Sequence, residues 1–167
     1  MPTPAPDTAA EVLASWRVHD RINLDLLAAL PPRGLTAISL ESRGRDVGHI
    51  FGHMHTVRVA WLRHNSAPGA ARLPVFRKGS RPSRAGLRSA LKASGKAVEQ
   101  LLARGLAGEH RRKMFRGSPV RWMSYLISHE SHHRGQILIA LRQSRMRLPD
   151  SIAIQRLWQS WYWGAPA

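Results

Sequence analysis

Apolar residues at helical spacing, in long stretches closed by proline or glycine, are the feature that most constrains the fold of this chain. Between residues 7 and 30 apolar side chains return at helical spacing, and Pro31 and Pro32 then end the pattern. Ser118 and Pro119 form a typical helix start, a capping hydroxyl followed by proline at the first helical position. The sequence has no alternating strand pattern of useful length and no internal repeat. The predicted fold class is therefore all-α.

Four long helices and one short terminal helix account for the pattern. Residues 66–81 contain proline, glycine and clustered basic residues, so they predict a loop. A length of 167 residues fits one ordinary domain that buries one hydrophobic core. The sequence predicts an up-down four-helix bundle with an additional short C-terminal helix, in a single domain covering residues 1–167. The main helices are expected at about 7–30, 46–65, 83–104 and 118–144, and the short helix at about 150–163.

The chain contains no cysteine, which narrows its chemistry. Disulfides, Cys-based zinc sites and a cysteine nucleophile are excluded, so a metal site would use histidine, carboxylates or water. The opening residues lack the pattern of a secretory signal, and no apolar run approaches the roughly 18 residues that a membrane span needs. We therefore expect a soluble cytoplasmic protein with no membrane partner.

The charge balance is strongly basic, with 26 Lys and Arg residues against 10 Asp and Glu and a net charge of +16. Such an excess occurs in proteins that bind nucleic acid, because phosphate contacts use Arg and Lys. The basic residues are spread over the whole chain, however, and biased genomic base composition would also produce their skew toward arginine. Nucleic acid is therefore the less favoured partner, although the charge does not exclude it.

The nine histidines are unevenly distributed, with three in HIFGHMH (residues 49–55) and three in HESHH (residues 129–133). His129 and His133 are four positions apart, a turn of about 40° and a rise of about 6 Å on a helix. Both imidazoles can then reach one metal ion from one helix face. A third ligand should come from a neighbouring helix, where His49 and His53 are also four apart.

Three histidines around one ion would leave open coordination positions, which is the geometry of a catalytic rather than a sealed structural metal. Paired histidines on helices also occur as hydrogen-bonding core residues. His132 and His55 are turned away from the pairs that they accompany. Spacing alone leaves open both the metal site and the choice between His49 and His53.

Two stretches carry a resemblance to a known family. HESHHRGQILIALRQ (residues 129–143) resembles the signature of the DinB/YfiT-like family of metal-dependent enzymes. VGHIFGHMHTVRVAWLR (residues 47–63) is similar to its other hallmark, a ligand histidine eight residues before a tryptophan. That tryptophan is Trp61 here, so the resemblance points to His53 rather than His49. The first and last helices, at 16–31 and 148–164, are also similar, and the resemblance covers nearly the whole chain.

The resemblance implies a four-helix bundle, often a homodimer, that holds a divalent ion such as Zn²⁺ or Ni²⁺ on His53, His129 and His133. It also implies a small-molecule substrate, because characterised relatives include transferases and isomerases that use low-molecular-weight thiols such as bacillithiol or mycothiol. We therefore expect a metal-dependent transferase, isomerase or hydrolase. The alternatives are a non-catalytic metal-binding protein and a basic nucleic-acid-binding helical protein.

Three neutral imidazoles would leave the full +2 charge on the ion, which lowers the pKa of bound water toward neutrality and deprotonates a coordinating thiol. Candidates for an acid, a base or an orienting group are Asp20 and Asn23, on the first helix, and Gln136, one turn beyond His133. The alternative for Gln136 is a helix-packing amide. Glu130 is about 100° around the helix from His129 and is expected to face solvent or another helix.

The remaining expectations concern packing. Arg134 is predicted to form a salt bridge, and Gly135 to let another helix approach closely. Trp122 and Tyr125 either wall a substrate pocket or belong to the core. The aromatic residues near the C-terminus predict a packing lid or a dimer surface: Trp158, Trp161, Tyr162 and Trp163.

Overall fold

The computed structural model describes residues 7–40, 45–77, 79–110 and 114–163, and the account below concerns these residues. They form five α-helices and no β-strand, so the all-α prediction is confirmed. A π-helical segment, Ser151–Arg156, leads directly into the last helix. Each long helix begins and ends within two residues of its expected position. The helices are α1 (Thr8–Ala29), α2 (Val47–His64), α3 (Arg84–Leu106), α4 (Pro119–Gln143) and α5 (Leu157–Trp163).

Each long helix begins at a side chain that accepts a hydrogen bond from the backbone of its first turn. The carboxylate of Asp7 accepts from Ala9 and Ala10 at the start of α1. Asp46 caps α2, and the hydroxyls of Ser83 and Ser118 cap α3 and α4. These caps satisfy backbone N–H groups that have no partner inside the helix. They explain why helix starts could be located from the sequence.

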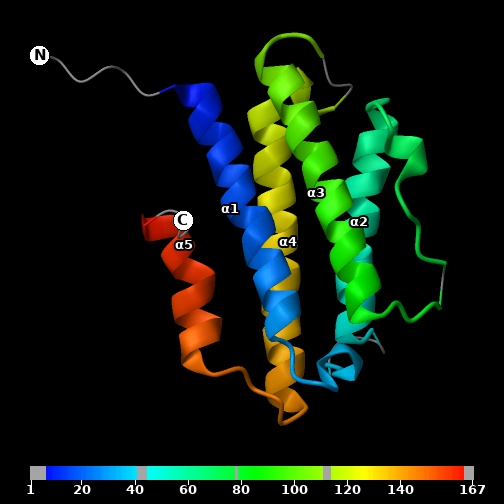
Figure 1. Ribbon diagram of the computed structural model, residues 1–167, viewed down its shortest axis with the longest axis vertical. Coiled ribbons are helices and arrows are strands. Elements are labelled where there is room, and N and C mark those ends of the chain that lie inside the picture. The colour runs from blue at the N-terminus through cyan, green and yellow to red at the C-terminus, as the bar shows by residue number, and fades with distance from the viewer. Residues whose placement is uncertain (1–6, 41–44, 78, 111–113, 164–167) are drawn as a thin grey trace, which may run out of the picture.

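The four long helices lie side by side, and α5 packs along α1 (Figure 1). In that view the chain descends in α1, ascends in both α2 and α3, and descends again in α4. The expected up-down order was therefore wrong at one connection, because α2 and α3 are parallel. Both helices contribute to the same two apolar clusters in the same order, with Phe51 and Leu91 in one cluster and Leu62 and Leu102 in the other.

The long connection at residues 65–83 allows this parallel order. It runs back along α2, where His55 Nε2 donates a hydrogen bond of 2.7 Å to the carbonyl oxygen of Pro74. The ring of Phe76 lies 5.4 Å from the ring of His55. An α2 of 18 residues is about 27 Å long, which an extended segment of this length spans easily. The loop was predicted, but its function as a crossover was not.

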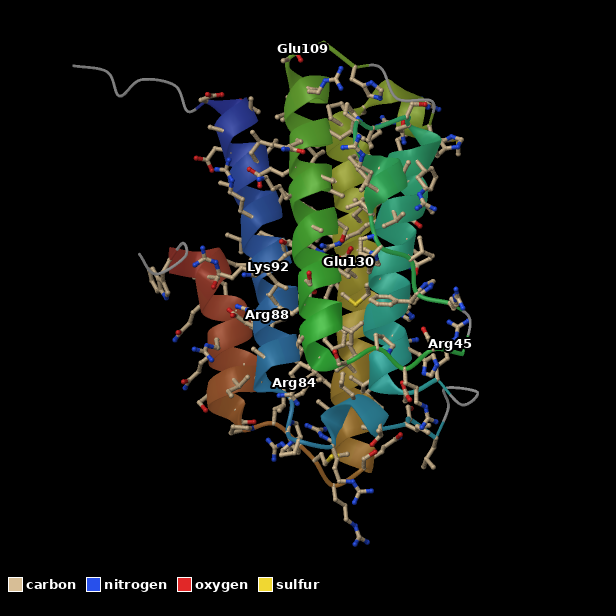
Figure 2. All side chains as sticks on the ribbon, turned by 45° about the vertical axis from the view of Figure 1, so that its right-hand side comes forward. Arg45, Arg84, Arg88, Lys92, Glu109 and Glu130 are labelled. Atoms are coloured by element: carbon tan, nitrogen blue, oxygen red, sulfur yellow. The ribbon has the colours of Figure 1, made fainter. Side chains whose placement is uncertain are left out.

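The apolar core consists of two clusters with a layer of buried polar side chains between them. One cluster contains Leu26, Phe51 and Ile137, and the other contains Trp16 and Trp122. Trp122 is completely buried, so the core alternative holds for this residue. The polar layer lies where Glu130 is labelled, midway along α4 (Figure 2). It joins α1, α2 and α4 across the centre of the molecule.

Glu130 is fully buried at the centre of this layer and faces α1 and α2 rather than solvent. Its carboxylate accepts two hydrogen bonds of 2.7 Å from Arg58 and one of 2.6 Å from Asn23. His19 Nε2 donates a further hydrogen bond of 2.8 Å. Burial alone would raise the pKa of Glu130, but the Arg58 guanidinium and these hydrogen bonds outweigh burial and hold the pKa well below its usual value. Glu130 is therefore a buried anion that anchors the helices to one another.

Candidate metal centre

Three histidine side chains converge where α2 passes α4. His53 from α2 and His129 and His133 from α4 place one ring nitrogen each within 4.8 Å of one another. The ring centroids of His53 and His133 are 4.8 Å apart, and those of His129 and His133 are 4.5 Å apart. The two α4 histidines lie on one face because they are four residues apart, and the packing of α2 against α4 brings in His53. Among the described residues, this is the group of three that could hold a metal ion.

The spacing of the nitrogens fits a small divalent ion. His129 Nε2 and His133 Nε2 are 3.1 Å apart. Imidazole nitrogens bind Zn²⁺ at about 2.0–2.1 Å, so adjacent ligands of one ion lie about 3.0–3.4 Å apart. The α4 pair already has this spacing. The three ligand nitrogens all lie within 4.8 Å of one another, so a small movement of the side chains would close the site around an ion.

The three imidazoles are also in the protonation state that binding requires. Burial, together with the nearby His133, His129 and Arg45, lowers the pKa of His53 to about 4. Burial likewise lowers the pKa of His129 and of His133. At neutral pH all three side chains therefore carry a free nitrogen lone pair, and binding of a metal would not have to displace protons.

Hydrogen bonding orients one of the rings. His133 Nδ1 donates to Gln136 Oε1 at 2.8 Å, which leaves His133 Nε2 as the unprotonated nitrogen that faces His129. The Gln136 amide nitrogen in turn donates to His132 Nε2 at 3.0 Å. His129 is positioned differently, because its ring stacks on Tyr125 at 5.8 Å while its buried Nδ1 has no hydrogen-bond partner.

The other histidines of the two motifs have different roles. His49 Nδ1 donates to Asp46 at 2.7 Å, close to the start of α2. His55 is fully buried and bonds to Ser94 and Pro74, on the side of α2 that faces α3 and the crossover. Neither lies in the converging group.

The sequence-predicted candidates on α1 also lie elsewhere. Asp20 accepts a hydrogen bond of 2.6 Å from Arg58, and Asn23 bonds to Glu130 and Arg134. Both belong to the buried polar layer around Glu130 and Arg58, apart from the converging histidines of α2 and α4. Arg134 donates to Asn23 and His19 rather than forming the predicted salt bridge, because its neighbours on α1 are an amide and an imidazole.

The surroundings of the three histidines differ from one flank to the other. On one flank Trp61, Phe115 and Tyr125 form an aromatic cluster, with ring centroids 5.0–5.8 Å apart. Tyr125 therefore lies next to the site, as the pocket-wall alternative for this residue required. On the other flank a hollow of about 280 Å³ is bordered by His53 and His49 of α2 and by the end of the crossover. The sequence analysis missed this hollow, because nothing local to residues 76–77 and 79–82 shows that they pack beside α2.

A comparison with protein-family models finds a match to the DinB family over residues 1–144. The chain belongs to the DinB family. The match confirms the resemblance seen in the two histidine motifs, and it includes all three converging histidines and the four long helices. No curated protein matches the chain. None of the described helices in this DinB-family protein is long and apolar enough to cross a membrane.

Proposed function

We propose that this DinB-family protein binds one divalent metal ion through His53, His129 and His133 and uses it to act on a small-molecule substrate. The observation that carries the proposal is the convergence of three neutral imidazole nitrogens within 4.8 Å. Imidazole ligands suit Zn²⁺ and Ni²⁺, the two ions that we favour. No carboxylate belongs to this ligand group, so the ion would keep its full positive charge.

When bound, the ion would supply the Lewis acidity that turns water or a thiol into a nucleophile near neutral pH. The protein would supply the arrangement around it. Gln136 holds the Nδ1 proton of His133, and Tyr125 supports the ring of His129. The aromatic cluster of Trp61, Phe115 and Tyr125 covers one flank, so substrate would enter from the other. We propose a transferase or isomerase with a low-molecular-weight thiol as cosubstrate, or a hydrolase.

Gln136 is the candidate whose position fits a role in the site, as a residue that orients His133. Asp20 and Asn23 are bonded into the buried layer, and we propose that they stabilise the helix packing. We further propose that the four long helices form the family's bundle in a single cytoplasmic domain, residues 1–167. The surface that we propose for a homodimer consists of the exposed aromatic residues of α5: Trp158, Trp161, Tyr162 and Trp163.

The catalytic part of the proposal is tested by comparing the metal-loaded protein, the chelated protein and the His133→Ala variant in one screen. The screen offers several low-molecular-weight thiols with electrophilic acceptors, and ester and amide substrates without a thiol. We expect a turnover that the loaded protein shows and the other two lack. Metal binding without turnover on any substrate would favour the non-catalytic alternative.

A second candidate function rests on the basic side chains of α3. Arg84, Arg88 and Lys92 follow one another at four-residue intervals along this helix (Figure 2). Arg88 and Lys92 are exposed, which favours an anionic polymer such as nucleic acid as a partner. This candidate predicts tight binding of duplex or single-stranded nucleic acid that weakens steeply with salt. Weak binding already at about 50 mM salt would exclude it.

A further inference from the structure

The hollow beside His53 is bordered by groups that favour an anion. Its principal lining side chains are Arg45, His49, His53, Phe76, Arg77 and Ser80. Arg45 is labelled at the outer edge of α2 in Figure 2. Among the described residues that line the hollow, two are arginines and none is a carboxylate. The nearby carboxylate of Asp46 is engaged by the backbone N–H and the ring of His49.

The charge of Arg45 acts on the three-histidine group itself. It is among the causes that lower the pKa of both His53 and His133. His53 lines the hollow and also belongs to the converging group. A molecule in the hollow would therefore lie next to a metal held by that group.

A buried hydroxyl in the hollow has no partner. Ser80 Oγ is inaccessible to solvent and makes no hydrogen bond within the protein. A buried polar atom without a partner costs about 1–3 kcal/mol, so most buried polar atoms in folded proteins are hydrogen-bonded. Ser80 lines the hollow between Arg77 and the start of α3, so a change of its rotamer would bring the hydroxyl to an acceptor oxygen bound there.

The shape of α2 keeps this space open. Gly48 and Gly52 lie one turn apart and both line the hollow, but only at Gly52 would an added Cβ meet another lining residue. A methyl group at Gly52 would touch only the ring of Phe76, at 3.6 Å. Glycine inside a helix is less favourable than alanine by about 1 kcal/mol. Since no tight contact excludes alanine at position 52, packing does not account for Gly52. The missing side chain at Gly52 keeps the space beside Phe76 open.

We propose that this hollow binds the oxyanion group, a carboxylate or a phosphate, of the molecule that reacts at the three-histidine site. Arg45 and Arg77 would pair with the oxyanion, and the Ser80 hydroxyl would donate to one of its oxygens. This inference rests on the proposed function and adds the substrate class to it. The substrate would be a small anionic molecule whose reacting group lies nearer to His53 than its charged group does.

The test uses the full chain loaded with Co²⁺, whose absorption spectrum changes when a thiol binds to the ion. Three probes are compared: 2-mercaptoethanol, which is neutral, 3-mercaptopropionate and 2-mercaptoethyl phosphate. We expect at least one anionic probe to bind about tenfold more tightly than the neutral one. In the double variant Arg45→Gln/Arg77→Gln this advantage should disappear, so that the anionic probes bind no more tightly than 2-mercaptoethanol does to the same variant. The Ser80→Ala variant should lose part of the preference for the anionic probe.

A matched control removes the same charge elsewhere. Arg21 and Arg121 are exposed and do not line the hollow, so Arg21→Gln/Arg121→Gln should keep the preference for the anionic probe. Equal binding of all three probes, or an equal loss in both double variants, would overturn the proposal. The anionic probe that shows the larger preference identifies the bound group as a carboxylate or a phosphate.

A metal-free measurement separates this inference from the proposed function. Acetate and inorganic phosphate are titrated into the metal-free chain while the amide NMR signals of Gly79 and Ser80 are followed. We expect saturable shifts in the wild type and none in Arg45→Gln/Arg77→Gln. If no thiol changes the cobalt spectrum but these shifts occur, thiol activation is wrong and the anion site stands. Absence of the shifts overturns the anion site.

Discussion

The Nδ1 atom of His133 lies 2.8 Å from Oε1 of Gln136, one turn further along α4. This hydrogen bond selects the tautomer in which Nε2 of His133 is unprotonated and faces His129 and His53. The same amide donates to His132 on its other side, so its orientation is fixed from both ends. An imidazole oriented in this way loses less freedom when it binds an ion.

Replacing Gln136 by Leu should weaken metal binding about 10- to 100-fold, because the ring of His133 loses the acceptor that orients it. Gln136→Glu keeps an acceptor at this position and should restore most of the affinity. His132→Ala removes only the far partner of the amide and serves as the control. Competition with a chelator of known affinity measures all three. Equal affinities for Gln136→Leu and the wild type would show that the hydrogen bond does not support the site.

Replacing Glu130 by Gln should destabilise the protein by about 3 kcal/mol or more, because the buried Arg58 loses its fully buried carboxylate partner and keeps only Asp20. The exposed pair Arg17–Glu99 provides the comparison, since Glu99→Gln should cost about 1 kcal/mol or less. Urea unfolding followed by circular dichroism gives both values. A similar small loss for the two variants would contradict the structural importance of the buried layer.

Two glycines in helices should respond to alanine in opposite directions. At Gly95 an added Cβ would collide with the carboxylate of Asp20, so Gly95→Ala should destabilise the protein by about 1–3 kcal/mol. At Gly135 nothing lies within 4 Å, so Gly135→Ala should stabilise it by up to about 1 kcal/mol through helix propensity. Thermal unfolding distinguishes the two. The expected close approach of another helix at Gly135 was therefore wrong, and the close contact is at Gly95 instead.

The metal-free protein should become less stable as the pH falls below about 6.5. Burial lowers the pKa of His19 and His55 in the folded state, and that of His53 to about 4. The unfolded chain therefore binds more protons between pH 6.5 and about 4, so stability is full above this window and decreases on acidification through it. Urea midpoints at pH 7.5 and 5.5 test the sign. His53→Gln should show a smaller decrease than the wild type, and a stability that rises on acidification would contradict the assignment.

Much of the fold followed from patterns that are local in sequence. Helix starts depend on a capping side chain and its own first turn, as at Asp46 and Ser118, so the helices could be placed within two residues. The direction of α3 depends on where the crossover packs against α2, through Pro74 and Phe76. That contact joins segments about 20 residues apart and leaves no periodic signal.

The candidate site likewise combines features that are local in sequence with features that are not. The spacing of His129 and His133 predicts a shared helix face, and that of Trp61 selects His53 by resemblance to the family. The surroundings of Glu130 were harder to predict. Helical rotation shows that Glu130 lies off the histidine face of the helix, but not that Arg58 bonds to it in the core. A single arginine within the apolar pattern of residues 50–62 was the available signal. Arg45 and Ser80 gave no comparable signal, since each reaches the hollow from a connecting segment.

The most direct test of the metal site is elemental analysis of the untagged protein, purified without a chelator, by mass spectrometry. The account predicts one divalent ion per chain, lost in His53→Ala and in His133→Ala and retained in His49→Ala, whose ring is held by Asp46. Absence of a stoichiometric ion from the wild type, or its retention in His53→Ala and His133→Ala, would contradict the account.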